Sequence, residues 1–246
     1  MDNFELILKN ACNILAEGME QRNENRELAK LNYGKLLDAH MLVVGVIGSE
    51  VISKSLVQGE SNASISGRLS LLASFIQGID LCETSITEGL YVQASTLLKQ
   101  EMETVAAMQE YVDDNRKNQK TPNVGKLKWG LNTLYGEINK LAHVADESTV
   151  NPLFKIRPIG DAKPVSIKPI YNKTISRRLY GLHVALLIQL AIAMEELHKD
   201  MYNEGFSEKK YEALNIAIQN LYDEGWLVED EEFVDDPDWP QPRYDN

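Results

Sequence analysis

The stretch that decides the fold is residues 90–112, LYVQASTLLKQEMETVAAMQEYV. On a helix at about 100° per residue, it has one apolar face with an acidic residue, Glu101, in its middle. Because burying an isolated charge is costly, a carboxylate there has to be paired, hydrogen-bonded or protonated. We therefore predict that other helices pack around this one and supply the partner. The apolar residues of the face are Leu90, Ala94, Leu97, Leu98, Val105, Met108 and Val112.

Glu101 has two interpretations. The one we favour is a structural ion pair that joins two helices, because the interior of a bundle is remote from any substrate. Its partner would be His183, Arg177 or Arg178, and with His183 it would form a buried polar centre. The alternative is a general base in a cleft, with a pKa raised by burial.

Apolar residues recur at helical spacing in six further segments: 3–20, 28–57, 67–87, 124–145, 174–202 and 207–223. The polar residues 20–27 are either a break or an exposed turn of a longer helix. Ser64 or Ser66 is the predicted N-cap of one helix and Thr174 that of another. Glu88-Gly89 separates two strong helices so briefly that we expect a tight antiparallel pair. The predicted fold is mostly α, an antiparallel helical bundle of six to seven helices.

Residues 150–173 differ in character, since four of the eight prolines lie there. Alternating apolar residues predict one short β-hairpin inserted at about 152–172, and the prolines favour an edge ribbon. Basic side chains of residues 155–178 are candidate phosphate contacts; the alternatives are a solvated hairpin and a docking site for the acidic tail. These candidates are Lys155, Arg157, Lys168, Arg177 and Arg178.

Charge divides the chain of 246 residues into a bundle domain, 1–227, and a tail, 228–246. The net charge is −12, of which the tail carries −7 because its eight acidic residues face Arg243 alone. A mildly acidic body disfavours general affinity for nucleic acid. The beginning of the chain lacks the pattern of a signal peptide, and no apolar run reaches the roughly 18 residues that span a bilayer. We expect a cytoplasmic protein without membrane contact, in which Cys12 and Cys82 are reduced and buried.

Motif spacing argues against the common catalytic and metal sites. Glu195-x-x-His198 has the spacing of a ligand pair in carboxylate-bridged metal bundles, but such a site needs a second pair. No acid precedes His40, His143 or His183 by three residues. The chain also lacks a glycine-rich phosphate loop, zinc-ligand spacing and a nucleophile elbow. We predict no metal and no cofactor.

A polar stripe borders the apolar face of the 124–145 segment and ends at His143. Its functional interpretation is RNA recognition, with His143 as a general acid or base near neutral pH and Asn139 beside it. The alternative is a polar helix edge whose histidine caps the last carbonyls. The stripe consists of Asn132, Gly136, Asn139 and His143.

Three blocks carry a resemblance: ITEGLYVQA (86–94), LLKQEME (97–103) and LYGEINKLAH (134–143). Over about residues 68–143 the chain resembles uncharacterised, mainly bacterial helical proteins that are distantly similar to the HEPN superfamily. That resemblance implies a small antiparallel helical bundle, often dimeric, of a kind found among RNA-cleaving toxins and phage-defence components. HEPN ribonucleases carry an arginine, a polar residue, four more residues and a histidine. With His143 as the histidine, Glu137 takes the place of the arginine and Ile138 that of the polar residue.

Two functions of different class follow. We favour a non-catalytic helical interaction protein with a HEPN-like scaffold, which binds a protein partner or itself in a defence or toxin–antitoxin context. The anion at position 137 supports this, because the cation that would stabilise a cleavage transition state is replaced. The alternative is a metal-independent RNA-cleaving enzyme or toxin that combines His143 with a basic group from 155–178.

Overall fold

The computed structural model describes residues 3–117, 119–144, 150, 153–154, 165–228 and 232–233. It is mostly α, as predicted. The helices are α1 (Asn3–Lys30), α2 (Lys35–Ser53), α3 (Ala63–Thr87), α4 (Tyr91–Val112), α5 (Tyr135–Ala142), α7 (Lys173–Tyr202) and α8 (Glu208–Asp223). Two 3-10 turns, η1 (Val124–Lys126) and η2 (Leu131–Leu134), precede α5, and strands β1 (Leu227–Val228) and β2 (Glu232–Phe233) follow α8.

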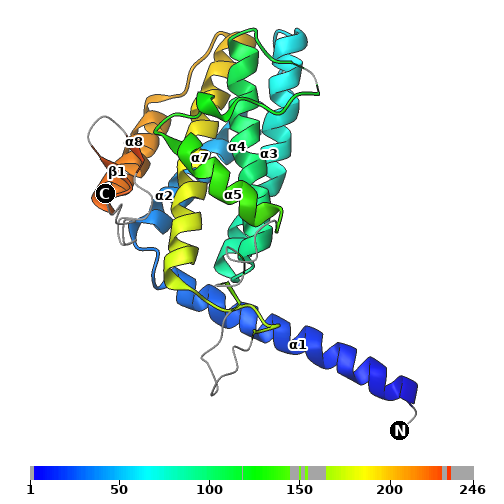
Figure 1. The fold of residues 1–246 in the computed structure, drawn as a ribbon. Helices are drawn as coiled ribbons and strands as arrows, with labels where there is room; N and C mark the ends of the chain where they lie inside the picture. Colours follow the sequence, from blue (N-terminus) through cyan, green and yellow to red (C-terminus); the bar gives the residue numbers. More distant parts are fainter. Residues whose placement is uncertain are drawn as a thin grey trace, which may run out of the picture.

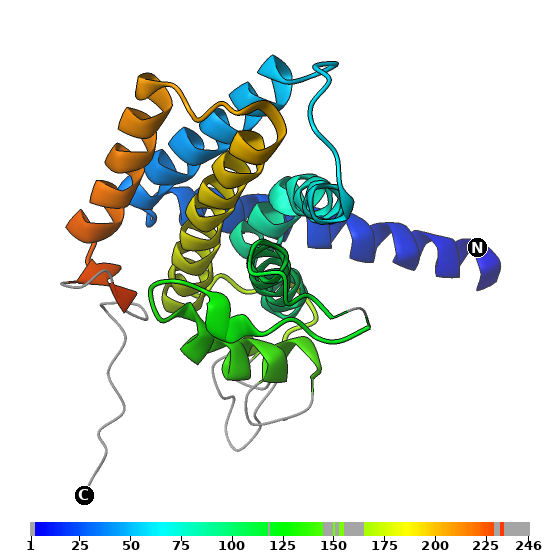
Figure 2. The same cartoon turned by 90° about the horizontal axis from the view of Figure 1, so that it is seen from above.

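Helix α7 runs through the middle of the bundle, as its nearly uniform apolar composition requires. The antiparallel pair α3 and α4 packs on one side of it and α2 with α8 on the other, while α5 lies against α4 (Figure 2). Helix α1 extends from the base of the bundle, and its N-terminal half projects away from the other helices (Figure 1). The core therefore surrounds α7, and one helix reaches well beyond it.

The first predicted boundary that was wrong lies between α1 and α2. Residues 20–27 are helical, so α1 continues to Lys30. Gly34 then has a φ of 52°, a left-handed conformation that favours glycine and breaks the helix predicted over 28–57. The caps also differ from the prediction, because asparagine side chains supply them. Asn62 accepts a hydrogen bond from the Ile65 amide at 2.8 Å, and Asn172 accepts one from the Ile175 amide at 3.0 Å.

The helix predicted over 124–145 is confined to α5, residues 135–142. Trp129 and Gly130 both have positive φ values, 59° and 67°, which interrupt a helix. Tertiary contacts hold this segment against α7. The Gln189 side chain accepts from the Lys128 amide at 3.1 Å and donates to its carbonyl at 3.2 Å. Helical periodicity could not reveal that bridge.

The tight α3–α4 connection was predicted correctly, and Gly89 adopts a φ of 80° within it. Most of the expected ribbon at 152–172, including Lys155 and Arg157, lies outside the described residues. Within it, the Ser166 amide donates to the Phe154 carbonyl at 2.9 Å. A two-stranded antiparallel sheet is present at the start of the tail, where Leu227 pairs with Phe233.

Candidate functional site

The buried polar centre joins α4 to α7. Nδ1 of His183 lies 2.9 Å from Oε2 of Glu101, and the two residues are 0% and 5% exposed. Among the three partners expected for Glu101, His183 is the one the structure brings to it. Because both side chains are almost fully buried, their mutual interaction has to offset two desolvation costs.

Cys82 of α3 belongs to the same centre. Its Sγ, a carboxylate oxygen of Glu101 and a ring nitrogen of His183 all lie within 4.8 Å of one another. Burial, together with the nearby Glu101 carboxylate, raises the pKa of the Cys82 thiol well above its ordinary value. The thiol is therefore protonated at neutral pH.

His40 of α2 lies next to this centre, beside His183. The ring centroids of His40 and His183 are 5.5 Å apart, and so are those of His40 and Tyr180. Burial and the neighbouring His183 lower the pKa of His40 to about 3, so its ring is neutral. By hydrogen-bond geometry, several buried polar atoms here have no partner among the described residues: Glu101 Oε1, His183 Nε2, both ring nitrogens of His40, and the Tyr180 hydroxyl.

The two members of Glu195-x-x-His198 bind different partners. Glu195 accepts a hydrogen bond from Tyr211 and pairs with Lys199 at 2.7 Å. His198 Nδ1 lies 3.0 Å from Oε2 of the buried Glu50. Glu195 and His198 thus each take part in a separate polar cluster.

His143 caps the C-terminal end of α5 and is exposed. Its amide donates to the Asn139 carbonyl at 3.1 Å, and its Nε2 lies 2.9 Å from Nζ of Lys99 on α4. Nζ of Lys99 also lies 3.9 Å from a carboxylate oxygen of Glu103, one turn along α4. The lysine at His143 was missed because it lies 44 positions away in the chain.

The arginines proposed to assist His143 are both bound to carboxylates. Arg178 donates to both oxygens of Glu137, at 2.6 and 2.7 Å, and this contact lowers the pKa of the Glu137 carboxyl. Arg177 is buried and binds Glu224 at 2.7 Å. Lys168 pairs with Glu17 at 2.7 Å. A phosphate at any of these three cations would have to compete with a carboxylate already in place.

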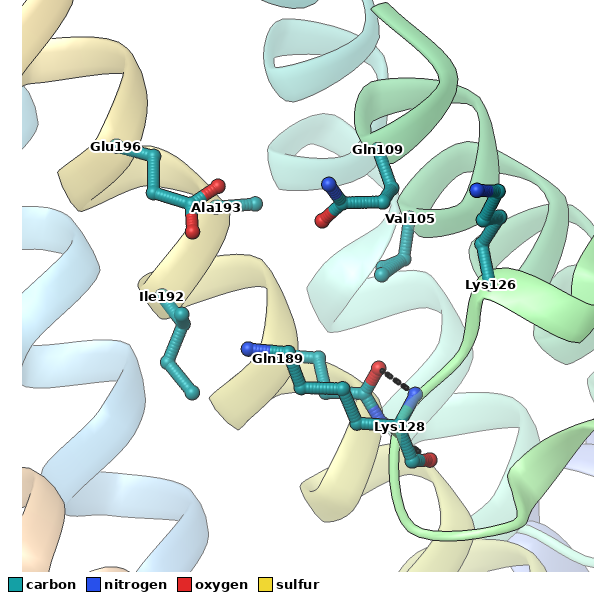
Figure 3. Close-up of a pocket in the computed structure, with 8 residues that line it drawn as sticks. All are labelled: Val105, Gln109, Lys126, Lys128, Gln189, Ile192, Ala193 and Glu196. Carbon is teal, nitrogen blue, oxygen red and sulfur yellow. Dashed lines mark hydrogen bonds between the residues drawn. The ribbon is translucent and has the colours of Figure 1, made fainter. Parts of the chain in front are cut away.

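A pocket between α4, α7 and the η1 segment is shown in Figure 3. Its lining combines apolar side chains with Gln109, Glu196 and the Gln189–Lys128 bridge, drawn there as dashed lines. Lys126 at its edge is paired with Asp113 at 2.6 Å. None of its eight lining residues is a histidine, cysteine or serine. The lining residues are Val105, Gln109, Lys126, Lys128, Gln189, Ile192, Ala193 and Glu196.

The N-terminal half of α1 presents large apolar side chains to solvent. Phe4 is 64% exposed and Leu15 is 72% exposed. Cys12 is exposed as well, so the prediction that both cysteines are buried holds for Cys82 only. Periodicity identified this apolar face correctly but could not show that it is exposed. Its exposed members are Phe4, Ile7, Leu8, Ile14, Leu15 and Met19.

Three helices, α2, α3 and α7, are long and apolar enough to cross a membrane by length and composition. Most of the apolar window of α7 is buried among the other helices, so packing in the core accounts for its composition. The corresponding windows of α2 and α3 are less than half buried. The cytoplasmic location stays a prediction.

Comparison of the chain with family models, with curated proteins and with solved structures finds no match. The resemblance to the HEPN superfamily therefore stays a prediction.

Proposed function

We propose that this chain is a non-catalytic helical interaction protein that pairs with a second copy of itself through the N-terminal half of α1. The observation that carries this proposal is the continuous apolar face of a helix that projects from the bundle (Figure 1). A HEPN-like scaffold, often dimeric, in a defence or toxin–antitoxin context remains part of the proposal.

The face has the pattern of a helix that packs against other helices. Phe4, Leu8, Ala11, Leu15 and Gly18 follow one another at alternating spacings of four and three. Such a repeat forms one seam along a helix, and the flanking isoleucines at 7 and 14 widen it to the stripe typical of core-facing helices. Contiguous apolar surface of this kind marks an interaction site.

The same helix face is buried farther along the chain. Asn25 and Ala29 continue the spacing of the seam and are buried against the body. Asn25 donates to the Glu88 carbonyl at 3.0 Å, while Arg22 and Arg26 both pair with the Glu88 carboxylate. The C-terminal half of α1 is thus anchored, and it holds the exposed half in a fixed direction.

A second copy suits this face because an isologous contact requires only one self-complementary patch. In an antiparallel pair whose two-fold axis passes between Ala11 and Cys12, Leu8 lies opposite Leu15 and Phe4 opposite Met19. The helix carries Glu5, Lys9 and Glu17 among its polar residues. Helices that lie on membranes are instead rich in lysine and arginine, so a protein surface fits better than a lipid surface.

We expect the wild type to be a dimer of the 27.7 kDa chain by light scattering after size-exclusion chromatography. Leu8→Glu/Leu15→Glu should be monomeric. Four leucines leave the contact, at about 1.5 kcal/mol or more each, so dimerisation should weaken roughly 10⁴-fold. The matched control, Asn10→Glu/Asn13→Glu, adds the same charge away from the seam and should remain dimeric. A monomeric wild type, or a leucine variant as dimeric as the control, would refute the proposal.

The contact between Lys99 and His143 is the observation in favour of the alternative, a metal-independent ribonuclease. A cation beside a histidine could stabilise an oxyanion and transfer a proton. The measurement is incubation of wild type and His143→Ala with a defined tRNA pool in the presence of EDTA. Our proposal predicts intact RNA with both proteins. Cleavage by the wild type that disappears in His143→Ala would establish the enzyme instead.

A further inference from the structure

Four helices each place one metal-ligating side chain in the same part of the core: His40 from α2, Cys82 from α3, Glu101 from α4 and His183 from α7. All four residues are buried. We propose that the bundle core holds a site for a divalent transition-metal ion of the zinc class. Cys82, Glu101 and His183 are three of its ligands, and His40 is the fourth. This site is independent of the exposed face of α1.

The ligand atoms are already close to the required geometry. One atom each from Cys82, Glu101 and His183 lies within 4.8 Å of the other two. Tetrahedral zinc, with bonds of about 2.0–2.3 Å, places its ligand atoms roughly 3.3–3.7 Å apart. To bring the three ligand atoms to these separations around an ion, the side chains have to shift by on the order of 1 Å. The His40 ring, 5.5 Å from that of His183, has to approach farther.

Unpaired polar atoms provide a second, independent indication. Glu101 Oε1 and both ring nitrogens of His40 are buried without a hydrogen-bond partner among the described residues. A polar atom left in this state costs free energy, and each such atom in a native fold calls for an explanation. A metal ion accepts electron pairs from a carboxylate oxygen and an imidazole nitrogen. It would satisfy both residues at once.

Charge balance fits a divalent ion. His183 is the one ionic partner that the described residues give Glu101, and neither lysine nor arginine pairs with this carboxylate. On binding, the Cys82 thiol releases its proton to solvent and its sulfur becomes a thiolate ligand. One thiolate, one carboxylate and two neutral imidazoles neutralise an ion of charge +2. The ion therefore removes the cost of a buried anion.

The donor set also limits the choice of metal. Two imidazole nitrogens, a thiolate and a single carboxylate suit zinc and cobalt, whereas magnesium and calcium prefer sites made of oxygen. Metal sites in helical bundles are built in this way, from side chains of facing helices. Positions 40, 82, 101 and 183 are spread over the chain, so no short motif reports them. The proposal thus revises the absence of a metal predicted from motif spacing.

One of the proposed ligands, Glu101, borders empty space between α3 and α4. A small pocket there is lined by Gly78 and Glu101, with Phe75 and Thr104 beside them. A Cβ added at Gly78 would meet no atom within 4 Å, so this glycine leaves open space at the pocket lining. Gln100 contributes a further polar group to the lining.

The test is titration of the full chain, stripped with EDTA and dialysed, with Co²⁺. We expect one equivalent to produce the visible bands of tetrahedral cobalt and a near-ultraviolet thiolate-to-cobalt charge-transfer band, both abolished by added Zn²⁺. Cys82→Ser should lose the charge-transfer band, and His183→Gln or His40→Gln should weaken binding at least tenfold. Cys12→Ser is the matched control, because that cysteine is exposed on α1, and it should bind like the wild type.

X-ray absorption at the zinc edge of the wild type gives a readout that needs no variant. It should show one sulfur together with nitrogen and oxygen ligands. Folding of each variant is checked by circular dichroism. The proposal is overturned if the folded wild type yields no tetrahedral cobalt spectrum, or if the charge-transfer band survives in Cys82→Ser.

Discussion

Replacement of Trp226 by alanine is expected to lower the free energy of unfolding by about 3–5 kcal/mol, the usual cost of truncating a buried tryptophan. The residue is fully buried although it follows α8, near the start of the tail. Its ring fills the space over Gly181 of α7, where an added Cβ would lie 2.5 Å from a ring atom. The Arg177 guanidinium lies 5.8 Å from the ring centroid. The ring thus attaches the end of α8 to the central helix.

Urea denaturation followed by far-ultraviolet circular dichroism measures this loss. Trp226→Phe is the control, since it keeps an aromatic ring over Gly181 and should lose less than half as much. Gly181→Ala tests the other side of the contact, and overpacking should cost about 1–3 kcal/mol. A loss below about 1 kcal/mol in Trp226→Ala, well under the usual range, would show that the ring does not hold α8 to α7.

Replacement of His183 by leucine should destabilise the metal-free protein by about 3–5 kcal/mol, because it leaves the Glu101 carboxylate buried without its partner. Leucine is close to histidine in size, so the loss of the charge partner dominates over any cavity. The measurement is urea denaturation in the presence of EDTA, which keeps the contribution of a bound ion out of the comparison.

The double variant Glu101→Leu/His183→Leu distinguishes this cause from a general loss of packing. Removing both members of a buried pair leaves no unpaired charge, and well-packed apolar replacements are often neutral. We expect the double variant to be more stable than His183→Leu alone. If the effects of the two single substitutions simply add, the pair does not carry the interaction assigned to it.

The helical fold was predictable because the apolar periodicity is strong in every long segment. The predicted helix boundaries that were wrong depend on contacts between distant parts of the chain. Residues 124–134 have helical periodicity, yet the Gln189 bridge and the positive φ of Trp129 interrupt an α-helix there, and only the short 3-10 turns η1 and η2 form. The break before α2 occurs at Gly34, whose neighbour Lys35 donates its amide to Glu224 at 2.9 Å. The sequence pattern around Gly34 gives no indication of Glu224, which lies far along the chain.

The candidate sites were also predictable only where their residues lie on a single helix. Glu101 was recognised because one charge on an apolar face is visible in a single helix, and His183 was among its named partners. Cys82 and His40 join them only through the packing of four helices. The apolar face of α1 was visible as periodicity, but the body covers Asn25 and Ala29 while it leaves Phe4 and Leu15 exposed. Which part of the α1 face is buried depends on how the helix packs on the other helices, and the sequence pattern does not give that packing.

Crosslinking at Cys12 tests the pairing of α1 most directly. The chain has two cysteines, and Cys82 is fully buried, so a short bismaleimide can link two folded copies only through Cys12. In the antiparallel pair both Cys12 thiols lie beside the two-fold axis. We expect a covalent dimer from the wild type on a denaturing gel, none from Cys12→Ser, and little from Leu8→Glu/Leu15→Glu. Wild-type protein that stays monomeric on the gel, while Cys12 reacts fully with a monofunctional maleimide, would contradict the account.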